Sequence, residues 1–275
     1  MLRKNIFISL IISLLCSLSF AQEIQFFGNI NQGNLIIGKG NNILWAWIDS
    51  TQIRVDSKNI FAFGIDAKEV GSRIIKIKHS DGKVLLKKIN LPVRKYKVQK
   101  INNSKQQFKN TPDSLIIRLE KEREISRKAY NEIGKIDTAF YKVGFIQPLK
   151  GGVVTSVFGS KRILNGIPKN MHNGLDIAAP KGTSVYAMTD GIVRLTADNF
   201  YYSGNYVLLD HGQGLSSFYL HLSKIIVHEG KKVKKGELIG KVGTTGRSTG
   251  PHLHWGVQWF SKRVDPSSLL ELEFN

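Results

Sequence analysis

Cysteine and proline are scarce in this sequence of 275 residues. It contains one cysteine, Cys16, and 7 prolines, against 26 glycines. A single cysteine cannot form a disulfide within the chain, so disulfides do not stabilise the fold. Hydrophobic residues make up 41% and charged residues 22% of the chain, which excludes a disordered, collagen-like or coiled-coil protein. The length allows one large domain or two modest ones.

Acidic residues are also scarce relative to basic ones. The chain has 21 Asp and Glu against 40 Lys and Arg, a formal net charge of +19. Such an excess of one sign bears on partners rather than on the fold. It favours anionic surroundings, which would be nucleic acid, a membrane face or an anionic cell-envelope polymer.

The N-terminus carries a basic and then apolar segment. Arg3 and Lys4 precede an apolar run over residues 6–15, and small residues stand at positions −3 and −1 of a cleavage site that ends at Ala21. This arrangement predicts a secretory signal peptide over residues 1–21. The run is too short to cross a bilayer comfortably, which disfavours an uncleaved anchor.

The predicted export narrows the choice among nucleic acid, a membrane face and an anionic cell-envelope polymer as the partner. Cleavage would remove Cys16 and leave a mature chain without a thiol. Lipidation of Cys16 is disfavoured because Leu15 stands before it, where a lipoprotein signal needs a small residue. An exported protein of the periplasm, cell envelope or extracellular space does not meet nucleic acid, and after cleavage we expect no stable membrane span. The positive charge then favours an anionic cell-envelope polymer.

Residues 22–100 show short alternating runs between turn signals, the pattern of an antiparallel sheet with one face in water. Asp81 and Gly82 stand between two such runs, which is a strong hairpin signal. We expect a small β-sandwich of immunoglobulin-like type. Trp45 and Trp47 would share one face of a strand, and packing in the core is favoured over a platform for a ligand.

Residues 101–144 are expected to form a basic linker and a helix. Thr111 and Pro112 are typical of a helix start and Gly134 of a helix end, so the helix would cover about twenty residues and connect the two domains. Between Gly82 and Pro112 there is no acidic residue, and this stretch would either bind a polyanion or form a solvated linker. Its basic residues are Lys83, Lys87, Lys88, Arg94, Lys95, Lys97, Lys100, Lys105 and Lys109.

Residues 145–270 return to short strands and glycine turns, which predicts a second β domain. This region has neither βαβ spacing nor a glycine-rich phosphate loop, so a nucleotide-binding fold has little support. The chain as a whole is therefore predicted to be mainly β.

Histidines are concentrated in this C-terminal region, since six of the seven lie between His172 and His254. His172 and Asp176 are four residues apart, and on an extended chain residues of equal parity face the same way. Gly174 between them disfavours a helix. His252 and His254 likewise share one strand face. Four candidate metal ligands thus come from two distant extended segments.

Imidazole nitrogen and carboxylate oxygen suit zinc, and a catalytic zinc site uses three protein ligands and leaves one position to water. His172, Asp176 and one of His252 and His254 would complete such a set. The other histidine of that pair, together with His221, would be free for acid–base chemistry. Zinc would activate water while the imidazoles move protons, which together describe a hydrolytic site.

Further motifs surround these histidines. They are Phe158-Gly159, His172-Asn173-Gly174-Leu175-Asp176-Ile177-Ala178, Pro180-Lys181-Gly182-Thr183, Tyr219-Leu220-His221-Leu222, Gly240-Lys241-Val242-Gly243 and Thr249-Gly250-Pro251-His252-Leu253-His254-Trp255. With these motifs, residues 146–267 resemble the M23 zinc metallopeptidases, the lysostaphin/LytM-type peptidoglycan endopeptidases.

The resemblance implies an antiparallel β peptidase domain in which His172, Asp176 and His254 hold one Zn²⁺. His221 and His252 would orient and deprotonate the attacking water and stabilise the tetrahedral intermediate. The substrate would be the peptide stems or cross-bridges of peptidoglycan, cut during cell-wall remodelling or lysis. The preceding β region and helix resemble those of family members that carry a small β domain ahead of the catalytic one.

Other activities stay open at this point. A catalytically inactive wall-binding protein, or an activator of another cell-wall hydrolase, is one alternative, although this chain keeps all five site positions. A secreted protease that acts on proteins is another. In a regulated enzyme, residues 164–170 or the helix at 112–134 would cover the metal.

The remaining histidines and several aromatic residues are assigned structural roles. His211 follows a strand and is expected to support the fold rather than bind a metal. His79 and His228 lie in polar, lysine-rich surroundings and are expected to be exposed. Core positions, with a substrate groove as the alternative, are expected for Tyr201, Tyr202 and Trp259.

Overall fold

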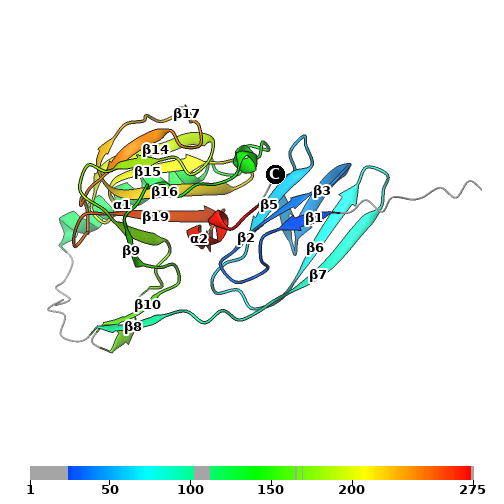
Figure 1. Ribbon diagram of the computed structural model, residues 1–275, viewed down its shortest axis with the longest axis horizontal. Helices are drawn as coiled ribbons and strands as arrows, with labels where there is room; N and C mark the ends of the chain where they lie inside the picture. The colour runs from blue at the N-terminus through cyan, green and yellow to red at the C-terminus, as the bar shows by residue number, and fades with distance from the viewer. Residues whose placement is uncertain (1–23, 102–111, 165, 169, 274–275) are drawn as a thin grey trace, which may run out of the picture.

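Two β-rich parts lie side by side in the computed structural model, which describes residues 24–101, 112–164, 166–168 and 170–273 (Figure 1). Strands dominate both parts, so the prediction of a mainly β protein is confirmed. The predicted signal peptide, residues 1–21, lies outside the described residues. Within the described ranges, no helix has the length and apolar character needed to cross a membrane.

The N-terminal part consists of two antiparallel sheets that share one core, in which Ile36 and Ile77 are fully buried. This agrees with a small sandwich, and its immunoglobulin-like type remains a prediction. The expected hairpin is present, with Gly82 in its turn at a φ of 86°. One sheet contains β1 (Gln25–Phe27), β2 (Leu35–Lys39) and β5 (Ile60–Gly64), and the other contains β4 (Thr51–Ile53), β3 (Ile43–Ile48), β6 (Gly71–His79) and β7 (Val84–Leu91), each in this spatial order.

The two tryptophans of β3 face outward, so the predicted core packing of Trp45 and Trp47 is wrong. Ala46 and Ile48, of the opposite parity, are buried instead. Alternation along a strand assigns residues to two faces but does not say which face is covered. The two indole rings meet edge to face with centroids 3.8 Å apart, and the ammonium group of Lys76 lies 5.5 Å from the Trp45 ring.

The basic segment leads from the N-terminal sheets to the C-terminal part. Its strand β8 (Val98–Ile101) pairs in parallel with β10 (Lys161–Leu164), which pairs in turn with β11 (Ile167–Pro168). This strand lies at the boundary between the predicted β domain, residues 22–100, and the predicted linker, residues 101–144. Its residues 102–111 lie outside the described part of the chain.

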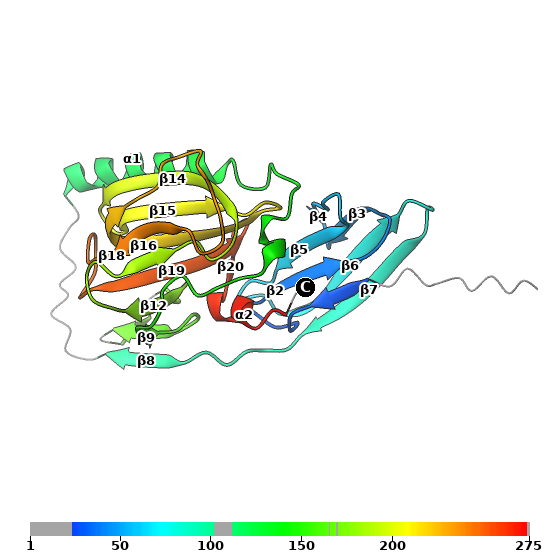
Figure 2. The same cartoon turned by 45° about the horizontal axis from the view of Figure 1, so that its top comes forward.

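The predicted helix is α1 (Asp113–Tyr130), with Pro112 at its N-cap and Asn131 at its C-cap. It ends before Gly134, which has a φ of 89° in the following turn. Thr111 lies outside the described residues. The helix does not connect the two parts as predicted, because Ala129 and its neighbours pack on one face of the large C-terminal sheet, as Figure 2 shows.

One ten-stranded sheet forms the C-terminal part, and its strand pairs are antiparallel as predicted. Its main path runs β17 (Lys232–Val233), β14 (Gly191–Phe200), β15 (Gly204–Asp210), β16 (Leu215–Ile225), β19 (His252–Trp259), β12 (Leu175–Ala178) and β9 (Val153–Ser156). Beside this path, β18 (Leu238–Val242) pairs with β16 and β13 (Ser184–Tyr186), and β20 (Lys262–Val264) pairs with β19. The short helices are η1 (Phe140–Val143) and α2 (Pro266–Leu270).

Strand β19 separates the core from the candidate site. Leu253 and Trp255 are fully buried in the core. His252 and His254 alternate with them and project from the opposite face. The apolar residues of β19 therefore fix which way the two histidines point.

The two parts share a continuous core at their junction. Gly64 of β5 lies against Trp259 and Val264 of the C-terminal sheet. The guanidinium of Arg94 donates to the carboxylate of Asp265 over 2.6 Å, and both side chains are largely buried. The N-terminal sheets are thus held against the strand that carries His252 and His254.

Replacement of Gly64 tests this junction. In Gly64→Ala the new Cβ would lie 2.8 Å from the Cβ of Trp259 and 3.0 Å from a methyl group of Val264. We expect the free energy of unfolding in urea to fall by about 1–3 kcal/mol, as for other overpacked cores. Gly250→Ala is the control, because no atom lies within 4 Å of the added methyl group. Equal stability of the two variants would contradict the packing described here.

Candidate active site

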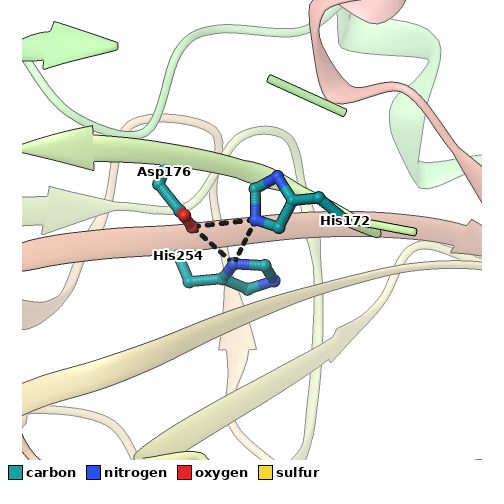
Figure 3. Close-up of side chains that lie close together, drawn as sticks. All are labelled: His172, Asp176 and His254. Carbon is teal, nitrogen blue, oxygen red and sulfur yellow. Dashed lines mark hydrogen bonds and ion pairs between the residues drawn. The ribbon is translucent and has the colours of Figure 1, made fainter. Parts of the chain in front are cut away.

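Three side chains converge at the open face of β12 and β19 (Figure 3). Asp176 and His254 are direct partners in the register of these strands, and His172 precedes β12. Asp176 Oδ1 lies 2.7 Å from His254 Nδ1 and 3.1 Å from His172 Nε2, and the two nitrogens are 3.2 Å apart. Within the described part of the chain this trio could hold a metal ion.

Backbone contacts fix the orientation of His172. Its Nδ1 lies 3.0 Å from the carbonyl oxygen of Val157, to which it can only donate. Its main chain exchanges two hydrogen bonds with residues 159 and 160. Nε2 is therefore the nitrogen that faces Asp176. Donation by the outer nitrogen to a carbonyl is the arrangement that orients metal-binding histidines.

The close approach of His254 depends on Gly174. A Cβ at position 174 would lie 2.8 Å from His254 Nε2 and 2.6 Å from the carbonyl oxygen of Trp255. The absence of a side chain therefore makes room for the imidazole. Phe218 supports the other side of that imidazole, with ring centroids 5.9 Å apart and the planes tilted by 25°.

The protonation states in the trio suit a cation. Burial alone would raise the pKa of the Asp176 carboxyl, but hydrogen bonds and charges from His172 and His254 outweigh it and hold this pKa well below its usual value. Burial lowers the pKa of His254. An ionised carboxylate beside the His254 imidazole, which loses its proton more readily than a free imidazole, suits a metal, because a metal binds deprotonated donors.

His221 and His252 flank the trio, so all five predicted site residues come together. Their ring centroids are 4.8 Å apart, and His252 Nε2 lies 4.0 Å from Asp176 Oδ1. Each Nδ1 lies 2.8 Å from a backbone carbonyl oxygen, that of Thr245 for His221 and that of Gly250 for His252. Both Nε2 atoms are consequently left for chemistry.

A β-bulge directs His221 to this face. In the pairing of β15 with β16, Asn205 lies opposite Leu222 but Val207 lies opposite Tyr219, so β16 contains one extra residue. His221 has a φ of 62°, which is uncommon for a residue other than glycine. Burial lowers its pKa to about 4, so the imidazole is neutral at neutral pH.

The other predicted positions divide into confirmed and corrected ones. His211 is fully buried and structural, and His228 is exposed, both as predicted. His79 is only 3% exposed, contrary to prediction, and its Nδ1 lies 3.1 Å from the carbonyl oxygen of Asn41.

Trp259 is a core residue as expected, and its Nε1 donates to the carbonyl oxygen of Gln213. Tyr201 and Tyr202 are exposed by 38% and 48%, so the core position expected for them is wrong. They lie in the turn between β14 and β15, where the chain reverses at the surface.

Sequence patterns missed the contribution of the N-terminal part to the site. A hollow of about 230 Å³ beside His172 is lined by Asp66 and Lys68, together with Asn170 and Arg263. Asn170 belongs to a segment predicted to cover the metal, and it lies beside His172, whereas Asn165 and Lys169 of that segment are outside the described residues. Contacts between residues so far apart in sequence leave no local pattern to recognise.

His211 provides a test of stability against pH. Its Nδ1 donates to the carbonyl oxygen of Asp190, its Nε2 lies 2.7 Å from the hydroxyl oxygen of Ser217, and burial lowers its pKa from 6.5 to about 4. Below pH 6.5 this histidine binds a proton in the unfolded chain but stays neutral in the folded chain. The free energy of unfolding should therefore fall between pH 6.5 and pH 4 by up to about 1.4 kcal/mol per pH unit.

Urea unfolding of wild type and His211→Gln at pH 7.5 and pH 5 measures this effect. The wild type should lose more stability on acidification than the variant, although the variant is less stable at pH 7.5. His228→Gln removes an exposed imidazole as a control. Equal losses in wild type and His211→Gln would contradict the assignment.

Comparison with known proteins agrees with this geometry. Residues 170–266 match the model of Peptidase family M23. Over 104 residues the chain is 49% identical to peptidoglycan DD-endopeptidase ShyA of Vibrio cholerae, a match that covers 37% of this chain and 24% of ShyA. Over 129 residues it is 41% identical to DD-carboxypeptidase/endopeptidase Mpg of Neisseria meningitidis, covering 46% of this chain and 30% of Mpg. The chain thus spans less than a third of either relative.

A solved structure extends the similarity beyond this segment. A chain from Pseudomonas aeruginosa, described as a peptidase M23, superimposes with a TM-score of 0.64 at 26% identity. The match covers 88% of this chain and 95% of that one, so it includes the N-terminal sheets. The matched segment, residues 170–266, contains the five converging histidine and aspartate residues, and this part of the chain is similar to peptidase family M23.

Proposed function

We propose that the chain is an exported zinc metalloendopeptidase that hydrolyses peptide bonds of peptidoglycan. The observation that carries the proposal is the convergence of His172, Asp176 and His254, with two further imidazoles beside them. The relatives ShyA and Mpg are named as peptidoglycan DD-endopeptidase and DD-carboxypeptidase/endopeptidase, which supports peptidoglycan as the substrate class. Work on that substrate would place the protein in the cell envelope or periplasm.

Zinc is the metal that this donor set suits best. Two imidazole nitrogens and one carboxylate oxygen are its usual ligands in catalytic sites, and three protein ligands leave one position open. Thiolates, which would favour other soft metals, are absent from the trio. When bound, zinc would lower the pKa of a water molecule and polarise the scissile carbonyl group.

His221 and His252 would handle the protons of the reaction. Their Nδ1–H groups are fixed on the carbonyl oxygens of Thr245 and Gly250, so each Nε2 has a defined direction and a free lone pair. A neutral imidazole can take a proton from water, and once protonated it can stabilise a negative oxygen and return the proton to the leaving amine. The two rings are close enough to divide these tasks between them.

The net charge of +19 suits a protein that works on an anionic envelope. Such attraction acts at long range and weakens as salt screens it. It would bring the enzyme to the wall without deciding which bond is cut. Affinity for an anionic polymer is therefore proposed separately from the peptidase activity.

Metal content tests the first half of the proposal. Wild-type protein, stripped with chelator and refilled, should bind one Zn²⁺ per chain by mass spectrometry of the metal. Asp176→Ala should reduce zinc affinity by at least about 100-fold, because even loss of a partner outside the ligand set costs about 10–100-fold. His221→Ala should still bind one ion. Full occupancy in Asp176→Ala would contradict the proposed ligands.

Digestion of purified peptidoglycan tests the second half. Zinc-loaded wild type should release fragments with new amino and carboxyl termini, identified by mass spectrometry. His221→Ala and His252→Ala should cut about 100-fold to 10,000-fold more slowly while keeping their zinc, because they lack a proton-transfer group. Casein is the comparison substrate for a general protease. A zinc-loaded wild type that releases nothing would instead support a wall-binding protein or an activator of another hydrolase.

A further inference from the structure

Arg263 lies on the same face of the sheet as the metal trio, a short way along it. It is paired with Gln258 in the register of β19 and β20. Directly paired residues of an antiparallel sheet project to the same side. Gln258 has the same parity as His254, so all three side chains belong to one face. The neighbouring Lys262 is paired with Trp259 and belongs to the other face.

Phe218 connects this arginine to the site. Its ring occupies the space above Gly256, where an added Cβ would meet it at 2.0 Å. The guanidinium carbon of Arg263 lies 5.0 Å from the centre of the ring, and the ring stacks on His254. The Phe218 ring thus lies over Gly256, two residues of β19 or about 7 Å beyond His254 along the strand, and the guanidinium adjoins this ring.

The positive charge of Arg263 has no acidic partner among the described residues. Its Nη1 is buried and makes no hydrogen bond there. Other partly buried arginines of this chain are paired, Arg94 with Asp265 at 2.6 Å and Arg194 with Asp210 at 2.8 Å. A shielded cation with an unpaired donor is costly unless an anion binds to it.

Asp66 does not supply that anion. Its Oδ2 accepts from the backbone nitrogen of Arg263 and its Oδ1 accepts from the backbone nitrogen of Lys68. Asp66 thus anchors β20 to the N-terminal part. Arg263 and Asp66 line the same hollow as His172, so this hollow joins the surroundings of the arginine to those of the metal trio.

We infer that Arg263 binds a free carboxylate of the peptide substrate and so determines which peptides are accepted. A guanidinium forms two parallel hydrogen bonds with a carboxylate, a geometry that a lysine does not reproduce. An extended peptide rises about 3.3–3.6 Å per residue. The carboxylate would accordingly lie about two residues from the scissile bond, as a chain terminus or an acidic side chain. This inference rests on the proposed peptidase function for its substrate class.

Binding measurements separate this inference from the question of turnover. Zinc-loaded His221→Ala protein, which should bind without cutting, is titrated with matched peptides in a calorimeter. One pair differs only in a terminal carboxylate or carboxamide, and a second pair differs only in Glu or Gln two residues from the scissile bond. In one of the pairs the acid should bind about 10-fold to 100-fold more tightly, which identifies the source of the carboxylate.

Variants of Arg263 assign that preference to the guanidinium. In the His221→Ala protein, the further substitution Arg263→Met should abolish the difference in affinity between the acid and amide peptides. Arg263→Lys in the same protein should keep only part of that difference. Lys262→Met is the matched control, because it removes one charge from the adjacent residue, whose ammonium is already paired with Glu69 at 2.7 Å. Zinc content should be unchanged in Arg263→Met, and its urea midpoint should not fall, because the variant removes a cation that lacks an acidic partner among the described residues of the free protein.

Cleavage rates supply the second readout. In the otherwise wild-type enzyme, Arg263→Met should raise KM for the preferred acid by the same factor and leave kcat nearly unchanged. Equal binding of acid and amide by the His221→Ala protein would overturn the inference, and so would an equal loss in Lys262→Met. Absence of any cleavage by wild type, with the acid still preferred in binding, would overturn the peptidase proposal and leave the carboxylate site in place.

Discussion

The pairing of β12 with β19 is the constraint on which the rest of the site depends. It sets Asp176 directly opposite His254 and brings their donor atoms to 2.7 Å. A shift of one residue between these strands would turn every side chain of one strand to the other face. Such a shift would move His254 out of the site and would also move Leu253 out of the core. Core packing and ligand geometry therefore select the same register.

Two irregular positions adapt this regular frame to chemistry. Gly174 leaves the space that the His254 ring fills. The bulge in β16 adds a fourth histidine, His221, to the site, whereas regular alternation along the strand would turn this residue to the opposite face. A positive φ at a residue with a side chain costs about 1–3 kcal/mol and persists only where neighbours enforce it. The carbonyl oxygens of Ser203 and Thr245 do so here by binding the backbone and the ring of His221.

Sequence patterns predicted the parts of the fold and site that depend on alternation. The spacing of His172 with Asp176 and of His252 with His254 was enough to bring four side chains to one face. The resemblance to a family then separated the metal-binding member of the second pair from the other. The order of strands in the large sheet could not be read in this way, since many orders satisfy the same alternation.

The errors arose where burial is decided by distant residues. Trp45 and Trp47 do share one face of β3, as predicted. Nothing in the sequence of β3 shows, however, that the core covers the opposite face, which carries Ala46 and Ile48. The role of Asp66 was missed because its carboxylate binds the backbone of Arg263, 197 residues away. Positions of this kind are defined only when the two parts of the molecule come together.

The hairpin of β19 and β20 belongs to the site and to the junction at once. His254, Trp259 and Arg263 lie on it, and Asp265 follows directly to hold Arg94. Detachment of the N-terminal sheets would therefore strip contacts from the same backbone that aligns the ligands. The two parts of the molecule should therefore unfold together in one cooperative transition. A fragment that lacks the N-terminal sheets should be less stable than the same residues in the whole chain.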